Sequence, residues 1–206
     1  GKLLTLPGLA KDFQPREHQR AAVARMIAEP SVGLFHAVGA GKTAEMVIGT
    51  MELKRLGLVN KPALCVPNHM LEQFSREWLQ LYPETRLLAA SSAELTDDRR
   101  RQFVARCATN DWDAIILTRT AFERLALQPH HEADFLDRQL AETRQALQRA
   151  NERGSSAGLR RAEKKMARRE EVLKAKRDKP RDAGISFEET GIDYLLIDEL
   201  HEYKNL

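Results

Sequence analysis

The chain has 206 residues, of which 42% are apolar and 31% charged, and its formal net charge is +3. This length can bury one sizeable core, whereas no run approaches the roughly 20 apolar residues of a membrane helix, and the first thirty residues show no secretory signal. The two cysteines, Cys65 and Cys107, form neither a disulfide framework nor a metal-ligand pattern. We therefore expect a cytoplasmic α/β protein with no membrane partner.

Short apolar runs alternate with helical patterns along most of the chain. Apolar residues recur at helical spacing over 14–28, 42–56, 68–81 and 96–107, and Asn68 and Thr96 stand where helix N-caps are expected. Five apolar runs predict strands, at 32–36, 63–66, 86–90, 113–117 and 194–197. Continuously apolar strands that alternate with helices are typical of a mostly parallel sheet covered on both faces.

The segment 129–182 departs from this pattern. One heptad-like apolar seam runs from Leu136 to Ala150 and a weaker one from Leu159 to Leu173, with a loop rich in helix-breaking residues over 151–158. We expect an antiparallel helical hairpin, an arm inserted into the α/β core. The predicted organisation is a core over 1–128, the arm over 129–182 and a return to the core over 183–206.

The strongest local signal is the run from His36 to Thr43, in which a glycine-rich turn follows an apolar run and opens a helix. Backbone N–H groups at such a turn, together with the helix dipole, bind phosphates. The pattern predicts that Gly39, Ala40 and Gly41 cradle the phosphates, that Lys42 reaches the β and γ phosphates, and that the Thr43 hydroxyl binds Mg²⁺. His36 stands where the full P-loop pattern has glycine.

A second signal lies near the end of the sequence, where the apolar run 194–197 is followed by Asp198 and Glu199. A carboxylate at a strand end can hold the Mg²⁺ shell, and its neighbour can orient and activate the attacking water. We assign these roles to Asp198 and Glu199 respectively. A surface acidic pair is the alternative, which the preceding apolar run and the P-loop disfavour.

Gly-Ala-Gly-Lys-Thr followed by Asp-Glu-Leu-His resembles motifs I and II of superfamily 2 helicases, the DEAD/DEAH-box group, and 202–205 is similar to the Swi/Snf-type branch. The sequence of these motifs most resembles that of bacterial, phage and plasmid proteins that join a helicase to a DNA methylase region. The resemblance implies a RecA-like P-loop NTPase lobe that uses ATP and Mg²⁺ on DNA, double-stranded by preference. The second RecA-like lobe and a methylase region would be partners within the parent polypeptide.

The resemblance also implies roles for further residues. The run from Phe13 to Gln19 is similar to the adenine-reading motif and places Gln19 against the base. Motifs Ia and Ib would place Pro67 and Asn68, and Thr118 and Arg119, on the nucleic-acid backbone. His201 would link the ATP site to the nucleic-acid side.

The charge of the arm is consistent with such a role. Between 160 and 181 there are eleven bases and four acids, a net charge of +7 that leaves the other residues at −4. Two interpretations stay open: a solvated helix face, or an arm that tracks DNA or docks a partner. The candidate DNA contacts are Arg160, Arg161, Lys164, Lys165, Arg168 and Arg169.

The sequence ends at Leu206, shortly after motif II, whereas family members continue into motif III and a second lobe with an arginine finger. We therefore expect a sheet incomplete at its C-terminal end, because the strands before Lys42 and Asp198 lack the neighbour that joins them. Such a fragment should be poorly stable and hydrolyse little ATP.

Two hypotheses follow for the function. The first is the ATP-binding lobe of a DNA-dependent ATPase, either a helicase or a double-stranded DNA translocase. The alternative is a nucleotide-independent module that presents a basic helical hairpin to DNA or a protein. A P-loop kinase or GTPase is disfavoured by the Asp-Glu-Leu-His box and by the lack of a guanine-specificity motif.

Overall fold

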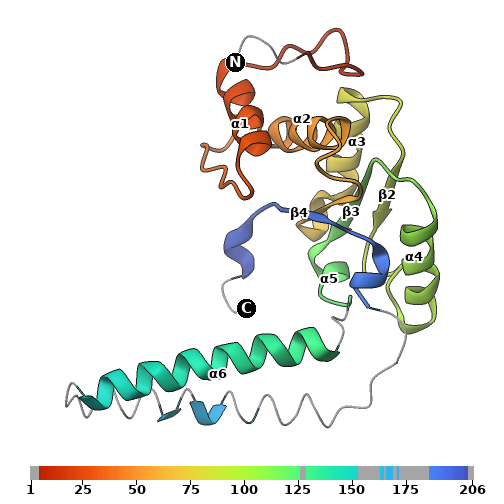
Figure 1. The fold of residues 1–206 in the computed structure, drawn as a ribbon. Helices are drawn as coiled ribbons and strands as arrows, with labels where there is room; N and C mark the ends of the chain where they lie inside the picture. The colour runs from red at the N-terminus through yellow and green to blue at the C-terminus, as the bar shows by residue number, and fades with distance from the viewer. Residues whose placement is uncertain are drawn as a thin grey trace. The chain divides into compact units, whose positions relative to one another are not determined.

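A computed structural model of the chain describes residues 5–125, 129–152, 163–164, 166–168, 171 and 186–203. The chain divides into two compact units, one formed by Gly1–Ala126 with Ile185–Leu206 and the other by Leu127–Gly184. The first unit is a layered α/β body, and the second contains the long helix α6 (Figure 1).

The first unit is built on a sheet of β1 (Pro62–Val66), β2 (Leu87–Ala90), β3 (Ala114–Thr118) and β4 (Tyr194–Ile197). Its strand order is β2-β3-β1-β4, and every pairing is parallel. Leu64 at the centre of β1 lies opposite Ile116 on one side and Leu196 on the other. The predicted α/β class with a parallel sheet is confirmed.

The predicted strand at 32–36 is wrong, because this segment takes no regular secondary structure. A strand persists only when a neighbour satisfies its N–H and C=O groups. Both edges of β1 are used, by β3 and β4, and no other described residues pair with the outer edge of β4. The apolar run before the glycine-rich turn therefore pairs with no strand, although the outer edge of β4 is open among the described residues.

Helices cover both faces of the sheet. On one face α1 (Glu17–Ala28), α2 (Lys42–Arg55) and α3 (Leu71–Leu81) share a core with the strand residues Leu64, Ile116 and Leu196. On the other face α4 (Asp97–Thr109) and α5 (Arg119–Phe122) pack on Ile115 and Leu117. Alternate residues of each strand thus enter opposite cores, which is why these strands are apolar throughout.

Of the two predicted helix caps, the place of Thr96 is confirmed and that of Asn68 is wrong. Asn68 opens a short 3-10 helix, η1 (Asn68–Met70), and its side chain accepts hydrogen bonds from Thr120 instead of capping α3. Thr96 does occupy the N-cap position of α4, but among the described contacts its side chain makes no capping hydrogen bond. An Asn side chain before a helix can bind a distant partner instead of capping the helix, and sequence spacing does not reveal that partner.

The second unit contains α6 (Pro129–Glu152), 24 residues long. Most of the predicted second helix of the arm lies outside the described residues, including Arg160, Arg161, Lys165 and Arg169. Lys164 and Arg168 are described, and both are helical and exposed. Across the part of the chain that the structure describes, helices are too short or too polar to cross a bilayer.

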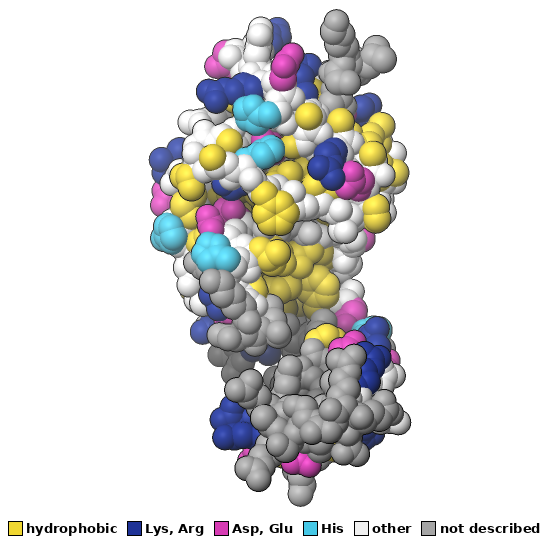
Figure 2. Space-filling view, turned by 90° about the vertical axis from the view of Figure 1, so that its left-hand side faces the viewer, with side chains coloured by type: hydrophobic (Ala, Val, Ile, Leu, Met, Phe, Trp, Pro, Cys, Tyr) yellow, Lys and Arg dark blue, Asp and Glu magenta, His cyan; other side chains and the backbone are white. Residues whose placement is uncertain are grey.

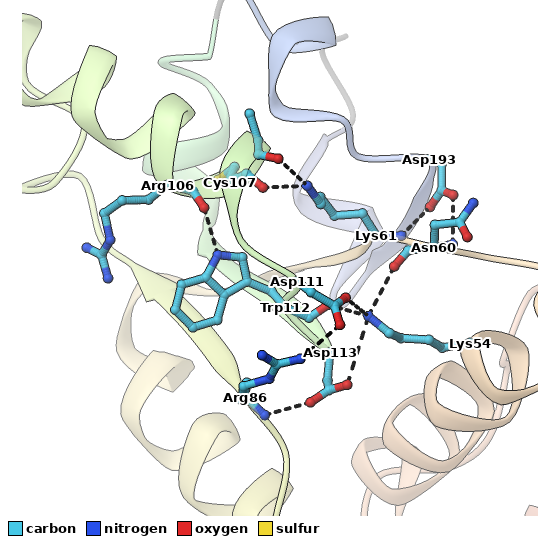
Figure 3. Close-up of polar contacts among 11 residues, drawn as sticks. Lys54, Asn60, Lys61, Arg86, Arg106, Cys107, Asp111, Trp112, Asp113 and Asp193 are labelled. Atoms are coloured by element: carbon cyan, nitrogen blue, oxygen red, sulfur yellow. Dashed lines mark hydrogen bonds and ion pairs between the residues drawn. The ribbon is translucent and has the colours of Figure 1, made fainter.

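A network of charged side chains ties the amino ends of the four strands together (Figure 3). The carboxylate of Asp193, just before β4, accepts the backbone N–H groups of Asn60 and Lys61 at 2.8 and 2.9 Å. Asp113, just before β3, accepts the N–H of Arg86 at 2.7 Å.

Two lysines extend this network to the helices on either face. Lys54 Nζ, from α2, donates to Asp111 Oδ1 and to the carbonyl of Asn60, both at 3.2 Å. Lys61 Nζ donates to the carbonyls of Cys107 and Ala108 near the end of α4, where a cation also complements the helix dipole. The amino edge of the sheet is therefore held by charge-assisted hydrogen bonds.

Candidate functional site

The glycine-rich loop enters α2 through two left-handed residues. Gly39 has φ +83° and Gly41, the N-cap of α2, has φ +87°, conformations that glycine adopts without steric cost. Between them, Ala40 N donates to Ala37 O at 3.2 Å and closes a turn. The first N–H groups of α2 have no carbonyl one turn earlier in the helix, so they are available to an anion.

The side chain of Gln19, in α1, binds the backbone of this loop. Its side-chain amide donates to Ala40 O at 3.4 Å and to Gly41 O at 3.3 Å, while Oε1 accepts the N–H of Arg16 at 2.9 Å. The residue is only 4% exposed. The contact of Gln19 with adenine stays a prediction; in this structure its side chain binds the backbone of the loop.

A buried carboxylate beside the loop was missed by sequence reasoning. Glu45, in the first turn of α2, has a side chain that is 0% exposed, and it accepts hydrogen bonds from His36 Nδ1 at 2.8 and 3.0 Å. His18 Nε2 lies 3.8 Å from Glu45 Oε1 and donates to Ala40 O at 3.0 Å. The two imidazole rings meet edge to face at 5.6 Å.

These contacts explain why histidine is accommodated where the P-loop pattern has glycine. An unpaired buried carboxylate is costly, so His36 and His18 supply partners that keep Glu45 in place. Together they hold both ends of the loop to the start of α2. The available signal was the departure at His36, but nothing in the sequence spacing links it to Glu45 or His18.

Lys42, the first residue of α2, lies across the same loop. Its ammonium donates to the carbonyl of His36 at 3.2 Å. Neither Lys42 nor Thr43 is buried, and both follow directly on the open N-terminus of the helix. The loop therefore combines an ammonium, a hydroxyl and free backbone N–H groups, a donor set suited to phosphate.

The acidic pair follows β4 as predicted. Asp198 N donates to Cys65 O at 2.9 Å and so extends the ladder beyond β4, and Asp198 Oδ1 accepts the N–H of Glu199 at 3.0 Å. Glu199 is the one non-glycine residue with positive φ among the described residues, at +51°. A left-handed backbone costs a non-glycine residue on the order of 1 kcal/mol, so Glu199 is held under strain. His201 Nδ1 lies 3.0 Å from Glu199 Oε2.

The predicted motif Ia and Ib residues meet at the carboxyl ends of β1 and β3. Asn68 Oδ1 accepts the backbone N–H and the hydroxyl of Thr120 at 3.3 and 3.1 Å, which joins the two segments. Thr118 caps α5 by accepting the N–H of Ala121 at 3.2 Å. Arg119 then opens α5, and its Nε donates to Glu123 Oε1 at 2.9 Å.

Tyr203 joins this group to the segment after β4. Its hydroxyl shares a hydrogen bond of 2.7 Å with Cys65 Sγ, and the Arg119 guanidinium lies 5.1 Å from the centre of its ring. Burial raises the pKa of the Cys65 thiol and of the Tyr203 phenol above their ordinary values, so both groups are neutral at pH 7. Sequence reasoning named Tyr203 only as part of the 202–205 resemblance and found no role for it.

The structure thus brings the predicted residues together in two groups within one unit. Gln19 lies against the loop 39–41 and Lys42 bridges it, while Asn68, Thr118 and Arg119 gather at the carboxyl ends of the strands. Pro67 directly precedes Asn68 after β1. The approach of Lys42 to Asp198 stays a prediction.

Large apolar side chains are exposed beside both predicted motifs. Phe35 is 95% exposed, Val38 99% and Leu200 64%. Figure 2 shows one face of the molecule on which histidines and several apolar side chains gather. Where such side chains form one contiguous patch, they mark a contact surface.

Comparisons with known proteins show the family to which the chain belongs. Among solved structures, the SWI2/SNF2 ATPase core of Sulfolobus solfataricus in complex with dsDNA is similar, with 18% sequence identity and a TM-score of 0.45 over 57% of this chain and 24% of that chain. The chain therefore spans about a quarter of that protein. No curated protein matches the sequence. The model of the family described as "Probable helicase domain" matches residues 26–206, so the chain belongs to this family of helicase domains.

Proposed function

We propose that the chain is the ATP-binding, RecA-like lobe of a DNA-dependent ATPase, a helicase or double-stranded DNA translocase of the DEAD/DEAH and Swi/Snf-like group. In the full-length protein, ATP hydrolysis would be coupled to movement on DNA. The observation that carries the proposal is the loop 39–41, which Gln19 holds against α1 and Lys42 spans at the open end of α2. Membership of the helicase-domain family supports it.

Within this function the residues take distinct roles. The N–H groups of Gly39, Ala40 and Gly41 and the ammonium of Lys42 bind the phosphates, for which Ala40 N must release its bond to Ala37 O. Glu199 orients and deprotonates the attacking water. His201, beside it, links the ATP site to the nucleic-acid side. The strained backbone of Glu199 is typical of residues at functional sites.

The donor set also suits Mg²⁺. Thr43 offers a hydroxyl and Asp198 a carboxylate, the hard oxygen ligands that Mg²⁺ takes beside nucleotide phosphates. No group of three or more His, Cys, Asp or Glu among the described residues could hold a metal by itself, and magnesium on a nucleotide needs only one or two protein oxygens. When bound, Mg²⁺ would neutralise charge that develops on the phosphates.

DNA and further segments of the parent polypeptide are the proposed partners. The motif Ia and Ib residues would bind the DNA backbone, and the Lys and Arg residues of the arm would add phosphate contacts. The exposed side chains Phe35, Val38 and Leu200 would be covered by a second RecA-like lobe, without which the chain hydrolyses little ATP. A methylase region linked to that lobe is proposed from the sequence resemblance.

Calorimetric titration of Mg·ATP into wild type, Lys42→Ala and Lys11→Ala tests the proposal. Lys11 is an exposed lysine of the same unit and controls for the loss of charge. We expect Lys42→Ala to weaken binding at least about tenfold, because a charge-assisted phosphate contact is lost, and Lys11→Ala to bind as wild type does. Equal affinity in all three proteins would refute nucleotide binding by this loop.

The alternative is a nucleotide-independent module that presents the basic arm, and it is favoured by the exposure of Lys164 and Arg168. It predicts that Lys42→Ala changes nothing, whereas replacing the arm's bases by Gln weakens DNA binding and flattens its salt dependence. The variant replaces Arg160, Arg161, Lys164, Lys165, Arg168 and Arg169. An unchanged salt slope would leave the arm a solvated helix.

A further inference from the structure

The guanidinium of Arg119 is already engaged in this chain without nucleic acid. Its Nε donates to Glu123 Oε1 at 2.9 Å, one turn further along the chain, and its Cζ lies 5.1 Å from the centre of the Tyr203 ring. Both contacts use the features of arginine that also bind a phosphate, its charge and its N–H donors. We call Glu123 and the ring of Tyr203 the Arg119 cage.

The ring is fixed in place by contacts of its own. The Tyr203 hydroxyl is bound to Cys65 Sγ at 2.7 Å, at the carboxyl end of β1. Tyr203 also belongs to the short 3-10 helix Leu200–Tyr203, which follows the acidic pair. The cage is therefore assembled from three separate stretches of chain, near 65, 119–123 and 203.

A phosphate oxygen and the cage compete for the same guanidinium. The side chain of Arg119 is 35% exposed and that of Glu123 47%, so a phosphate can approach, but the Glu123 carboxylate repels it and occupies Nε. Binding through Nε then requires that the ion pair open and that the guanidinium turn from the ring. Each contact released subtracts from the affinity gained.

We propose that Glu123 and Tyr203 restrain Arg119 and thereby set the affinity of the phosphate-backbone site at the start of α5. The proposal rests on the proposed function, in which Arg119 binds the DNA backbone. Opening an ion pair one helical turn apart, or a half-buried cation–π contact, reduces affinity by about two- to fivefold. Removal of either member of the cage should therefore tighten binding by about that factor.

Fluorescence anisotropy of a labelled DNA duplex at low ionic strength tests this with the whole chain. We expect Glu123→Gln and Tyr203→Leu to bind about two- to fivefold more tightly than wild type, and Tyr203→Phe, which keeps the ring, to stay near wild type. Glu84→Gln removes the same charge from another exposed position of the unit and controls for net charge. Glu123→Gln no tighter than Glu84→Gln would overturn the proposal.

The effects must also pass through Arg119. In an Arg119→Ala background, Glu123→Gln should give no gain beyond that of Glu84→Gln, because the restrained group is gone. If wild type does not bind DNA, or Arg119→Ala binds as well as wild type, the proposed DNA contact fails. If Arg119→Ala weakens binding but Glu123→Gln does not tighten it, the contact stands and the cage is refuted. Should Tyr203→Leu fail to fold by circular dichroism, the Glu123 pair decides alone.

Discussion

Two glycines of the phosphate-binding loop share a backbone conformation but differ in their surroundings, and this difference gives a sharp test of the role of Gln19. Gly39 and Gly41 have φ of +83° and +87°. A methyl group added at Gly39 meets nothing within 4 Å, whereas at Gly41 it overlaps the amide nitrogen of Gln19. Gly39→Ala therefore probes backbone strain alone, and Gly41→Ala probes strain together with displacement of Gln19.

The magnitudes follow from these contacts. A left-handed alanine costs on the order of 1 kcal/mol, and this should be the whole cost of Gly39→Ala. At Gly41 the displaced amide is buried and loses its bonds to Ala40 O and Gly41 O, which adds about 1–3 kcal/mol. We expect Gly41→Ala to lower the free energy of unfolding by about 2–4 kcal/mol.

Urea titration of both variants measures the difference. The double variant Gln19→Ala with Gly41→Ala serves as the control, because without the amide the methyl group at 41 has space. Relative to Gln19→Ala alone, Gly41→Ala should then cost no more than Gly39→Ala does in the wild type. Equal losses of unfolding free energy for Gly39→Ala and Gly41→Ala in the wild-type background would refute the role of Gln19 in holding the loop.

Three further predictions concern other parts of the unit. Asp193→Ala should lower the unfolding free energy by about 1–2 kcal/mol in urea, since two backbone N–H groups lose a charged acceptor; an equal loss in Asp12→Ala, an exposed control, would contradict this. Glu199→Gly should raise the unfolding free energy by about 1 kcal/mol, because glycine relieves the left-handed backbone. Glu84→Gly, the control, should lower the unfolding free energy. A lower unfolding free energy in both variants would show that Glu199 is unstrained. Burial raises the pKa of the Cys107 thiol to about 12, whereas the thiol of the unfolded chain has a pKa of about 8.5. The stability that the neutral Cys107 thiol supplies is therefore complete below about pH 8.5 and is lost as the pH rises toward 12. Between pH 8 and 10 the unfolding free energy of Cys107→Ala should fall less steeply than that of wild type, and equal slopes would argue against the buried thiol.

Local pattern was enough to predict most of the fold. The runs 63–66, 86–90, 113–117 and 194–197 became β1–β4 within one or two residues, because a strand buried on both faces must be apolar throughout. The run 32–36 is also mostly apolar, although it contains Gly33 and His36, and it is no strand. Apolar composition assured neither burial nor pairing here, since Phe35 is 95% exposed. A strand also needs a partner, and the partner of a parallel strand lies far away in sequence.

In the candidate site too, the sequence predicted some residues and missed others. Motif spacing placed Lys42 at the first position of α2 and Asp198 directly after β4, since both depend on a turn next to one element. The contacts of Glu45 with His36 and His18 join residues 9 and 27 positions apart and follow no short motif. Gln19 and Tyr203 likewise have partners that only the folded chain reveals.

The two edges of the sheet are built on different principles. At the amino edge, Asp193 before β4 and Asp113 before β3 accept the backbone N–H groups of Lys61 and Arg86, which directly precede β1 and β2. At the carboxyl edge, Arg119 rests on exposed and exchangeable partners, and Glu199 is held in a strained backbone. The hydrogen bonds at the amino edge fix the strand registers, which leaves strain and competing contacts to the opposite edge. Substitutions at the amino edge should therefore act on stability alone, whereas those of Glu123 and Tyr203 at the carboxyl edge should alter DNA binding more than stability.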